Sequence, residues 1–131
     1  MGGCAAALTL ARAGRSVILT EETDWLGGQI TSQGVSALDE HPWIESFGGT
    51  RSYYELRETV RRYYREHAVP AVAGAERNPG GGWVSHLCFE PRAGVWALEQ
   101  MLGPQREGGR LTLLLRHRAV AAEVRDDAVQ A

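Results

Sequence analysis

The sequence predicts an α/β fold, and three observations support this. Two short runs with almost no polar residues, 16–20 and 111–115, are typical of parallel strands that are buried on both faces. Helical patterns precede and separate these runs, at 2–13, 52–67 and 91–102. The segment from Val120 to Val129 has the pattern of a β-hairpin. The resulting order of helix, strand, long insertion, helix, strand and hairpin is that of an α/β domain.

Composition restricts the chain to a compact domain without a strong overall charge. It has 131 residues, 44% of them hydrophobic, which is enough for one core. A net charge of −2 gives no reason to expect a nucleic-acid or membrane-surface partner. Cys4 and Cys88 form neither a metal-binding spacing nor a disulfide framework, which favours a reducing, cytoplasmic compartment.

The first helix, 2–13, consists mainly of strong helix formers, and Gly14 is expected to end it. The strand at 16–20 follows at once and leads into Glu21 and Glu22. Residues 26–50 are rich in Gly, Ser, Thr and Gln, which indicates a loop.

The next helix, 52–67, is predicted to start at a Ser52–Glu55 capping box. One stripe of this helix is apolar and aromatic, and we expect it to be core. The opposite stripe is expected to be solvated and consists of Arg57, Glu58, Arg61, Arg62 and Arg65.

Residues 83–89 are expected to form a strand. A further helix, 91–102, is expected to begin at Pro91 and to stop at Gly103-Pro104.

A partial phosphate-binding motif stands at the start of the chain. In a dinucleotide-binding unit a strand leads into a G-x-G-x-x-G turn and a helix, and an acid about 20 residues later bonds the ribose. Met1, Gly2 and Gly3 fit the last x-x-G, and Gly3 would allow close packing on the neighbouring strand. Glu21 stands eighteen positions after Gly3, at the end of the second strand. We therefore expect a Rossmann-like unit whose first strand is missing.

The stretch VILTEETDWLGGQITS resembles the second strand and following segment of flavoproteins with two dinucleotide-binding domains. The longer stretches LGGQITSQGVSALDEHPWIESFGGTRSYYELRE and NPGGGWVSHLCFEPRAGVWALEQML resemble the bacterial FAD-dependent oxidoreductase family, near the flavin subunit of heterodisulfide reductases. The resemblance covers Gly2 to about Val124. Gln29 and Trp25 stand where arginines are common, which departs from the charged part of the motif but not from its glycines.

The resemblance implies FAD as the cofactor and assigns it a set of contacts. Gly2 and Gly3 would lie at the diphosphate and Glu21 at the adenosine ribose, with Glu22 the weaker ribose candidate. The segment after the strand would line the diphosphate, the ribityl chain and the flavin, through Gly27, Gly28, Gln29, Thr31, Ser32 and Gln33. Iron–sulfur clusters of longer relatives need closely spaced cysteines, and the two cysteines here do not have that spacing.

No catalytic acid or base follows from these patterns. His41 follows two acids in the loop after the FAD segment and could transfer protons, but an exposed loop histidine has the same pattern. Arg51 could bind a substrate carboxylate, or simply lie in the first turn of a helix. His86 and Cys88 would share one face of the strand at 83–89, either as a reactive pair or through packing.

The resemblance implies the FAD-binding portion of a flavin-dependent oxidoreductase, in three parts. Residues 1–33 would be the cofactor-binding βαβ remnant, 34–90 an insertion, and 91–131 a helix, a strand and the start of a hairpin. We expect the isolated chain to retain little FAD and to be inactive, with its substrate unknown. A truncated, cofactor-free α/β piece with a structural or interaction role is an alternative, and so is an NAD-binding module.

Overall fold

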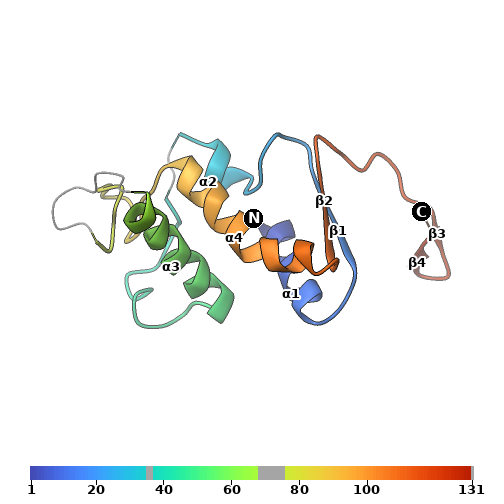
Figure 1. The fold of residues 1–131 in the computed structure, drawn as a ribbon, viewed down its shortest axis with the longest axis horizontal. Coiled ribbons are helices and arrows are strands. Elements are labelled where there is room, and N and C mark those ends of the chain that lie inside the picture. Colours follow the sequence, from blue (N-terminus) through green and yellow to red (C-terminus); the bar gives the residue numbers. More distant parts are fainter. Residues whose placement is uncertain (35–36, 68–75, 131) are drawn as a thin grey trace.

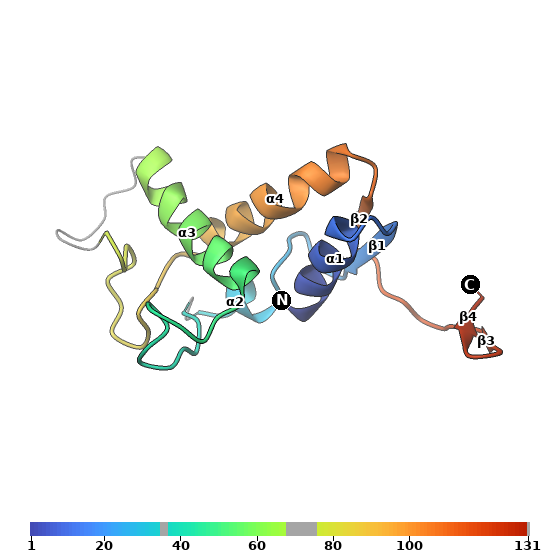
Figure 2. The same ribbon diagram turned by 90° about the horizontal axis from the view of Figure 1, so that it is seen from below.

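The computed structural model of the chain describes residues 1–34, 37–67 and 76–130 and confirms the α/β prediction. Helix α4 is central and packs on α1, α2, α3 and strand β2 (Figures 1 and 2). The elements are α1 (Gly2–Arg12), β1 (Val17–Glu21), α2 (Gln29–Ser32), α3 (Arg51–Glu66), α4 (Pro91–Glu107), β2 (Leu111–Leu115), β3 (Val124–Arg125) and β4 (Ala128–Val129).

Strands β1 and β2 are parallel neighbours, paired from Val17 with Leu111 to Glu21 with Leu115. The parallel arrangement was predicted, but the burial of both faces was wrong. Leu19 packs against the core, whereas Ile18 is 70% exposed. Successive side chains of a strand point to opposite faces, and the described helices cover only one face of this sheet.

Helix α1 buries one stripe and ends at a glycine, as predicted. The buried positions Cys4, Ala7, Leu8 and Ala11 have the spacing of a single helix face. At its end the N–H of Gly14 donates to Ala11 and the N–H of Arg15 donates to Leu10, both at 3.0 Å. Gly14 has a positive φ of 81°, so this is a Schellman ending, which positions β1 directly after the helix.

Helix α3 begins one residue earlier than expected, and its predicted capping box is wrong. The cap is Thr50, whose hydroxyl accepts the N–H of Tyr53 at 3.2 Å. The predicted core stripe is confirmed by the burial of Leu56, Val60, Tyr63 and Tyr64. The predicted solvated stripe is wrong at Arg57, whose side chain is only 1% exposed, and holds only in part at Arg61, whose side chain is 14% exposed.

Helix α4 begins at Pro91 as predicted but continues through Gly103-Pro104 to Glu107. Glycine has no Cβ to collide with the proline ring, so the residue before the proline can stay helical here. The strand expected at 83–89 is wrong. Only an isolated bridge between Ala37 and Cys88 forms there, among residues that turn around Gly80–Gly82.

The C-terminal hairpin is confirmed but is shorter than its sequence pattern. Its strands β3 and β4 are two residues each, and Asp126 and Asp127 both have positive φ in the turn, at 51° and 60°. This is the combination found in tight two-residue hairpin turns. The hairpin lies at the end of an extended segment, away from the helices (Figure 1).

Candidate functional site

The first turn of α1 lies directly against the Gly27–Gly28 turn. The α-amino nitrogen of Met1 donates to the carbonyl oxygen of Gly27 at 3.2 Å. A Cβ on Gly28 would lie 3.5 Å from the same nitrogen. Figure 2 shows the N-terminus beside α2, the short helix that follows this turn. Two segments that are 26 residues apart in the sequence therefore form one surface.

The Gly27–Gly28 turn requires glycine for its backbone. Gly27 has φ of 117° and Gly28 has φ of 55°, values that residues with a Cβ rarely adopt. A Cβ on Gly27 would also collide with the side chain of Thr31. Thr31 is buried, and its hydroxyl donates to the carbonyl of Leu26 at 2.7 Å, with the carbonyl of Gly28 3.2 Å away. Thr31 thus fixes the turn from inside.

Gly2 and Gly3 differ in what surrounds them. A Cβ on Gly3 would lie 3.4 Å from the Cδ1 atom of Leu19, so α1 packs closely on β1 at this position. A Cβ on Gly2 would meet nothing within 4 Å. Both glycines are exposed, and the first N–H groups of a helix have no partner within it. The start of α1 therefore presents backbone donors to open space, which suits an anionic group.

Glu21 lies at the carboxyl end of β1, as the ribose assignment requires. Its Oε1 atom accepts the N–H of Thr23 at 3.0 Å and the hydroxyl of Thr23 at 2.9 Å. No hydrogen bond from the described residues reaches its Oε2 atom. The backbone carbonyl of Glu21 accepts the N–H of His117 at 3.0 Å, which attaches the end of β1 to the segment after β2. The carboxylate is thus held with one oxygen available to a ligand.

Cys4 is a member of this region that the sequence reasoning did not assign. Its side chain is buried beneath the first turn of α1. Burial raises the pKa of the thiol, and the charge of Glu21 raises it further. The α-amino group and a hydrogen bond from the Gly27 backbone lower that pKa but do not outweigh burial. The thiol therefore lies close to the groups that define the site without being activated by them.

The remaining predicted contacts occupy or follow α2. Gln29 and Ser32 are exposed, Gln33 is half-buried, and Thr31 is buried with its hydroxyl engaged. Gln29 and Ser32 can face a ligand, whereas Thr31 acts on the turn itself. The carboxylate of Glu22 is exposed one residue beyond the end of β1.

His41 and Arg51 do not join this cluster. The Nδ1 atom of His41 accepts the N–H of Trp43 at 3.1 Å, and its ring lies 5.5 Å from that of Phe47, so it supports its own loop. Arg51 begins α3 and lines a cavity with Arg12, at the opposite end of α1 from Gly2.

His86 and Cys88 do not form a pair. His86 is exposed, whereas Cys88 is buried with its Sγ atom 3.7 Å from the carbonyl oxygen of Ser85. Of the two readings, packing therefore accounts for the position of Cys88.

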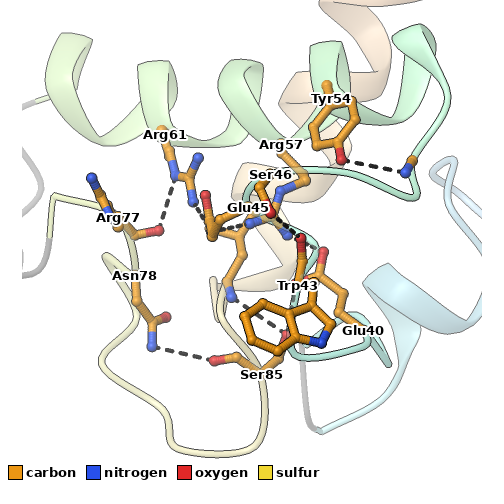
Figure 3. A network of polar contacts seen from close by, with 12 residues as sticks. Glu40, Trp43, Glu45, Ser46, Tyr54, Arg57, Arg61, Arg77, Asn78 and Ser85 are labelled. Atoms are coloured by element: carbon orange, nitrogen blue, oxygen red, sulfur yellow. Dashed lines mark hydrogen bonds and ion pairs between the residues drawn. The ribbon is translucent and has the colours of Figure 1, made fainter.

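A buried polar network, which the sequence did not predict, fixes loops 37–50 and 76–89 beneath α3 (Figure 3). The carboxylate of Glu40 pairs with Arg57, and both side chains are 1% exposed. The same carboxylate accepts the hydroxyl of Tyr53 at 2.7 Å and that of Ser85 at 3.1 Å. Burial raises the pKa of Tyr53, and its hydrogen bond to Glu40 raises it further. The charges therefore satisfy one another and serve packing.

A second carboxylate extends this network toward the surface. Glu45 pairs with Arg57 and, at 2.7 Å, with Arg61. Arg61 also donates through Nε to the carbonyl of Arg77 at 2.9 Å. Loops 37–50 and 76–89 are thereby joined to one helix (Figure 3).

The arrangement at the start of α1 fits a dinucleotide. Open backbone donors and a glycine turn with no side chain in the way suit a diphosphate, and a carboxylate at a strand end can accept the hydroxyls of a ribose. A metal centre lacks comparable support, since no group of three or more His, Cys, Asp or Glu gathers among residues 1–34, 37–67 and 76–130. In the same parts of the chain, every helix is too short or too polar to cross a membrane.

Comparison with known proteins identifies the family of the chain. The family model described as FAD dependent oxidoreductase matches residues 1–131, which is the whole chain. Searches of curated proteins and of solved structures return no match. The family match makes FAD the cofactor and identifies the chain as an FAD-binding portion of a flavin oxidoreductase.

Proposed function

The chain belongs to the FAD-dependent oxidoreductase family, and on that premise we propose that residues 1–33 hold the diphosphate and the adenosine ribose of FAD. The observation that carries this proposal is the contact between the start of α1 and the Gly27–Gly28 turn, where the α-amino group lies 3.2 Å from the carbonyl oxygen of Gly27. The exposed backbone donors at the start of α1 and the side-chain-free Gly27–Gly28 turn converge there. Their convergence supports one elongated anionic ligand rather than two separate sites.

Each group has a distinct role in this proposal. The N–H groups of Gly2 and Gly3 bind the diphosphate, because they lack partners within the helix. Gly28 lets the backbone approach the diphosphate without a Cβ between them, and Gly27, where a Cβ would meet Thr31, gives the turn its shape beside the diphosphate. Glu21 accepts the ribose hydroxyls through its free Oε2 atom.

The residues of α2 would act along the rest of the cofactor. Gln29 and Ser32 are exposed and line the ribityl chain, whereas buried Thr31 holds the turn in place. FAD, when bound, supplies the electron transfer itself. The protein therefore contributes position and a polar, glycine-lined surface.

The finer assignments rest on the sequence, through its resemblance, its cysteine usage and its net charge. We place the protein near the flavin subunit of bacterial heterodisulfide reductases, in the cytoplasm. We divide it into a cofactor-binding part at 1–33, an insertion at 34–90 and a C-terminal part at 91–131. The substrate is a small molecule of unknown class, and no nucleic acid is expected. His41 and Arg51 stay weak catalytic candidates, since neither adjoins the Gly27–Gly28 turn.

Calorimetric titration with FAD and, separately, with NAD⁺ tests the cofactor assignment. Gly2→Leu and Thr9→Leu are matched variants, because each adds the same side chain to an exposed position of α1. A Cβ on Gly2 meets no protein atom within 4 Å, so this variant should fold normally. We expect Gly2→Leu to weaken FAD binding by about tenfold or more, which corresponds to about 1.4 kcal/mol. Thr9→Leu should bind as the parent does.

Glu21→Gln tests the ribose contact in the same titration. The amide keeps the size of the side chain but removes the charge that strengthens a hydrogen bond from a hydroxyl group. Binding should weaken by about three- to tenfold. Equal affinity in the parent and both site variants would contradict the proposal. Tighter binding of NAD⁺ than of FAD would favour the NAD-binding alternative, and no binding of either would favour the cofactor-free one.

A further inference from the structure

A second cavity borders the end of α1 that lies away from the glycine turn. Arg12, Arg51 and Glu55 line it, and its volume is about 600 Å³. Cavities of about 300 to 1,000 Å³ are typical of small-molecule sites. Helix α1 has 11 residues, and at about 1.5 Å per residue this cavity lies roughly 16 Å from the diphosphate end. It is therefore separate from the proposed FAD contacts.

Arg12 is held in a fixed position on one wall of this cavity. Its Nη1 atom donates to Glu55 Oε2 at 2.9 Å, and its Nη2 atom donates to Glu55 Oε1 at 2.7 Å. The hydroxyl of Ser52 lies 3.5 Å from Nη1. This fork–fork contact sets the orientation of the guanidinium before any ligand arrives.

Arg51 differs from the other arginines of α3 because it has no carboxylate partner among the described residues. Arg57, Arg61, Arg62 and Arg65 each have a carboxylate within 4.0 Å. In the described residues Arg51 has no such partner, and it is exposed. The charge of Arg51 nevertheless acts on Glu55 in the cavity. The hydrogen bond from Arg12 is the main cause that holds the pKa of Glu55 below its ordinary value, and the charge of Arg51 contributes to the same shift.

We propose that this cavity binds a small organic molecule through an oxyanion, either a carboxylate or a phosphate, with Arg51 as its principal contact. Two guanidinium groups and one carboxylate leave the lining with one positive charge. A planar guanidinium matches the two oxygens of a carboxylate or phosphate group. The cavity is larger than a bare phosphate ion, which leaves space for an organic portion. This proposal requires no contact with FAD and is independent of the proposed cofactor site.

Titration with inorganic phosphate and with acetate, at constant ionic strength, tests the site and separates the two oxyanions. We would use the Gly2→Leu variant, because it obstructs the diphosphate end of α1 and leaves Arg51 intact. The anion with the tighter binding identifies the class of the ligand. Failure of both anions to bind would overturn the proposal.

Two further substitutions should change the affinity for the anion in opposite directions. Arg51→Gln should weaken binding of the preferred anion by about tenfold, whereas Glu55→Gln should tighten it by a few-fold. Removal of the Glu55 charge leaves Arg12 available to the ligand, so a gain cannot come from misfolding. Arg106→Gln, at an exposed arginine in the last turn of α4, is the matched control and should change nothing. An equal loss in Arg51→Gln and Arg106→Gln would show general surface attraction and refute the site.

Discussion

The start of α1 and the loops beneath α3 are both polar, but they satisfy their polar groups in opposite ways. At the start of α1, Gly2 and Gly3 are exposed, and a Cβ on Gly2 would meet no described atom within 4 Å. Beneath α3, the side chains of Glu40 and Arg57 are buried together, and the carboxylate has partners for both oxygens. Unpartnered polar groups near the surface are suited to a ligand, whereas mutually satisfied groups in the interior serve to hold the fold.

This difference teaches where substitutions should affect stability and where they should affect binding. A buried charge is costly unless its partner is present, so changes in the insertion should act mainly on folding. Exposed backbone donors cost little in the free protein, so changes at Gly2 should act mainly on FAD binding.

The largest expected effect is the loss of the buried guanidinium. Arg57→Met leaves the carboxylate of Glu40 without its counter-charge in a site that is 1% exposed. We expect the free energy of unfolding, measured in urea, to fall by about 3–5 kcal/mol.

Arg65→Met is the matched control, because Arg65 pairs with Glu58 on the surface of the same helix, where its side chain is 57% exposed. Its effect should be below about 1 kcal/mol. Adding Glu40→Gln to Arg57→Met should recover part of the lost stability. Equal effects of Arg57→Met and Arg65→Met would remove the distinction between the two regions.

A smaller effect is expected from the backbone of the turn. Gly27→Ala places a Cβ at φ of 117° and against Thr31, which should cost about 1–3 kcal/mol of unfolding free energy. Thermal unfolding measures this cost. Gly34→Ala is the control, because a Cβ there meets no atom of the described residues within 4 Å. A cost at Gly27 no greater than at Gly34 would show that the turn is not held as described.

The smallest expected effect is on the acid dependence of stability. Burial raises the pKa of Glu45, but the hydrogen bond from Arg61 and the arginine charges outweigh burial and leave the pKa below its ordinary value of 4.5. A carboxylate with a lowered folded pKa stabilises the fold above the unfolded pKa and loses this contribution as pH falls through the folded one. The urea concentration at the midpoint of unfolding should therefore decrease as the pH is lowered below 4.5. This decrease should be smaller in Glu45→Gln than in the parent. An unchanged acid limb in that variant would contradict this account.

The sequence was sufficient for the elements whose cause is local. Gly14 ended α1, the apolar runs gave β1 and β2, and paired aspartates gave the hairpin turn. Glu21 was also placed correctly at a strand end, because the acid directly follows an apolar run. The assigned roles of Gly27 and Gly28 stay predictions, although their positive φ angles explain why glycine stands there.

The buried network could not be predicted, because its partners come together only in three dimensions. Glu40 and Arg57 are 17 residues apart and lie on a loop and a helix. One local signal was present: position 57 has helical spacing with Tyr53, Val60 and Tyr64, the core side of α3. The charge of Arg57 led to its assignment to solvent. In the same way, the spacing of Cys4 with Ala7, Leu8 and Ala11 indicated its burial, but not its contact with Gly27.

The two cysteines provide one chemical probe in each region. Cys4 and Cys88 are both free and buried, the first under the start of α1 and the second in the loops joined to α3. A thiol-alkylating reagent can reach either one only when its surroundings open, so labelling rates read by mass spectrometry report local unfolding of each region separately. The labelling rates with and without cofactor can therefore be compared in one experiment. Protection of Cys4 with an unchanged rate at Cys88 would show that the cofactor stabilises the α1 region and leaves the loops beneath α3 unaffected.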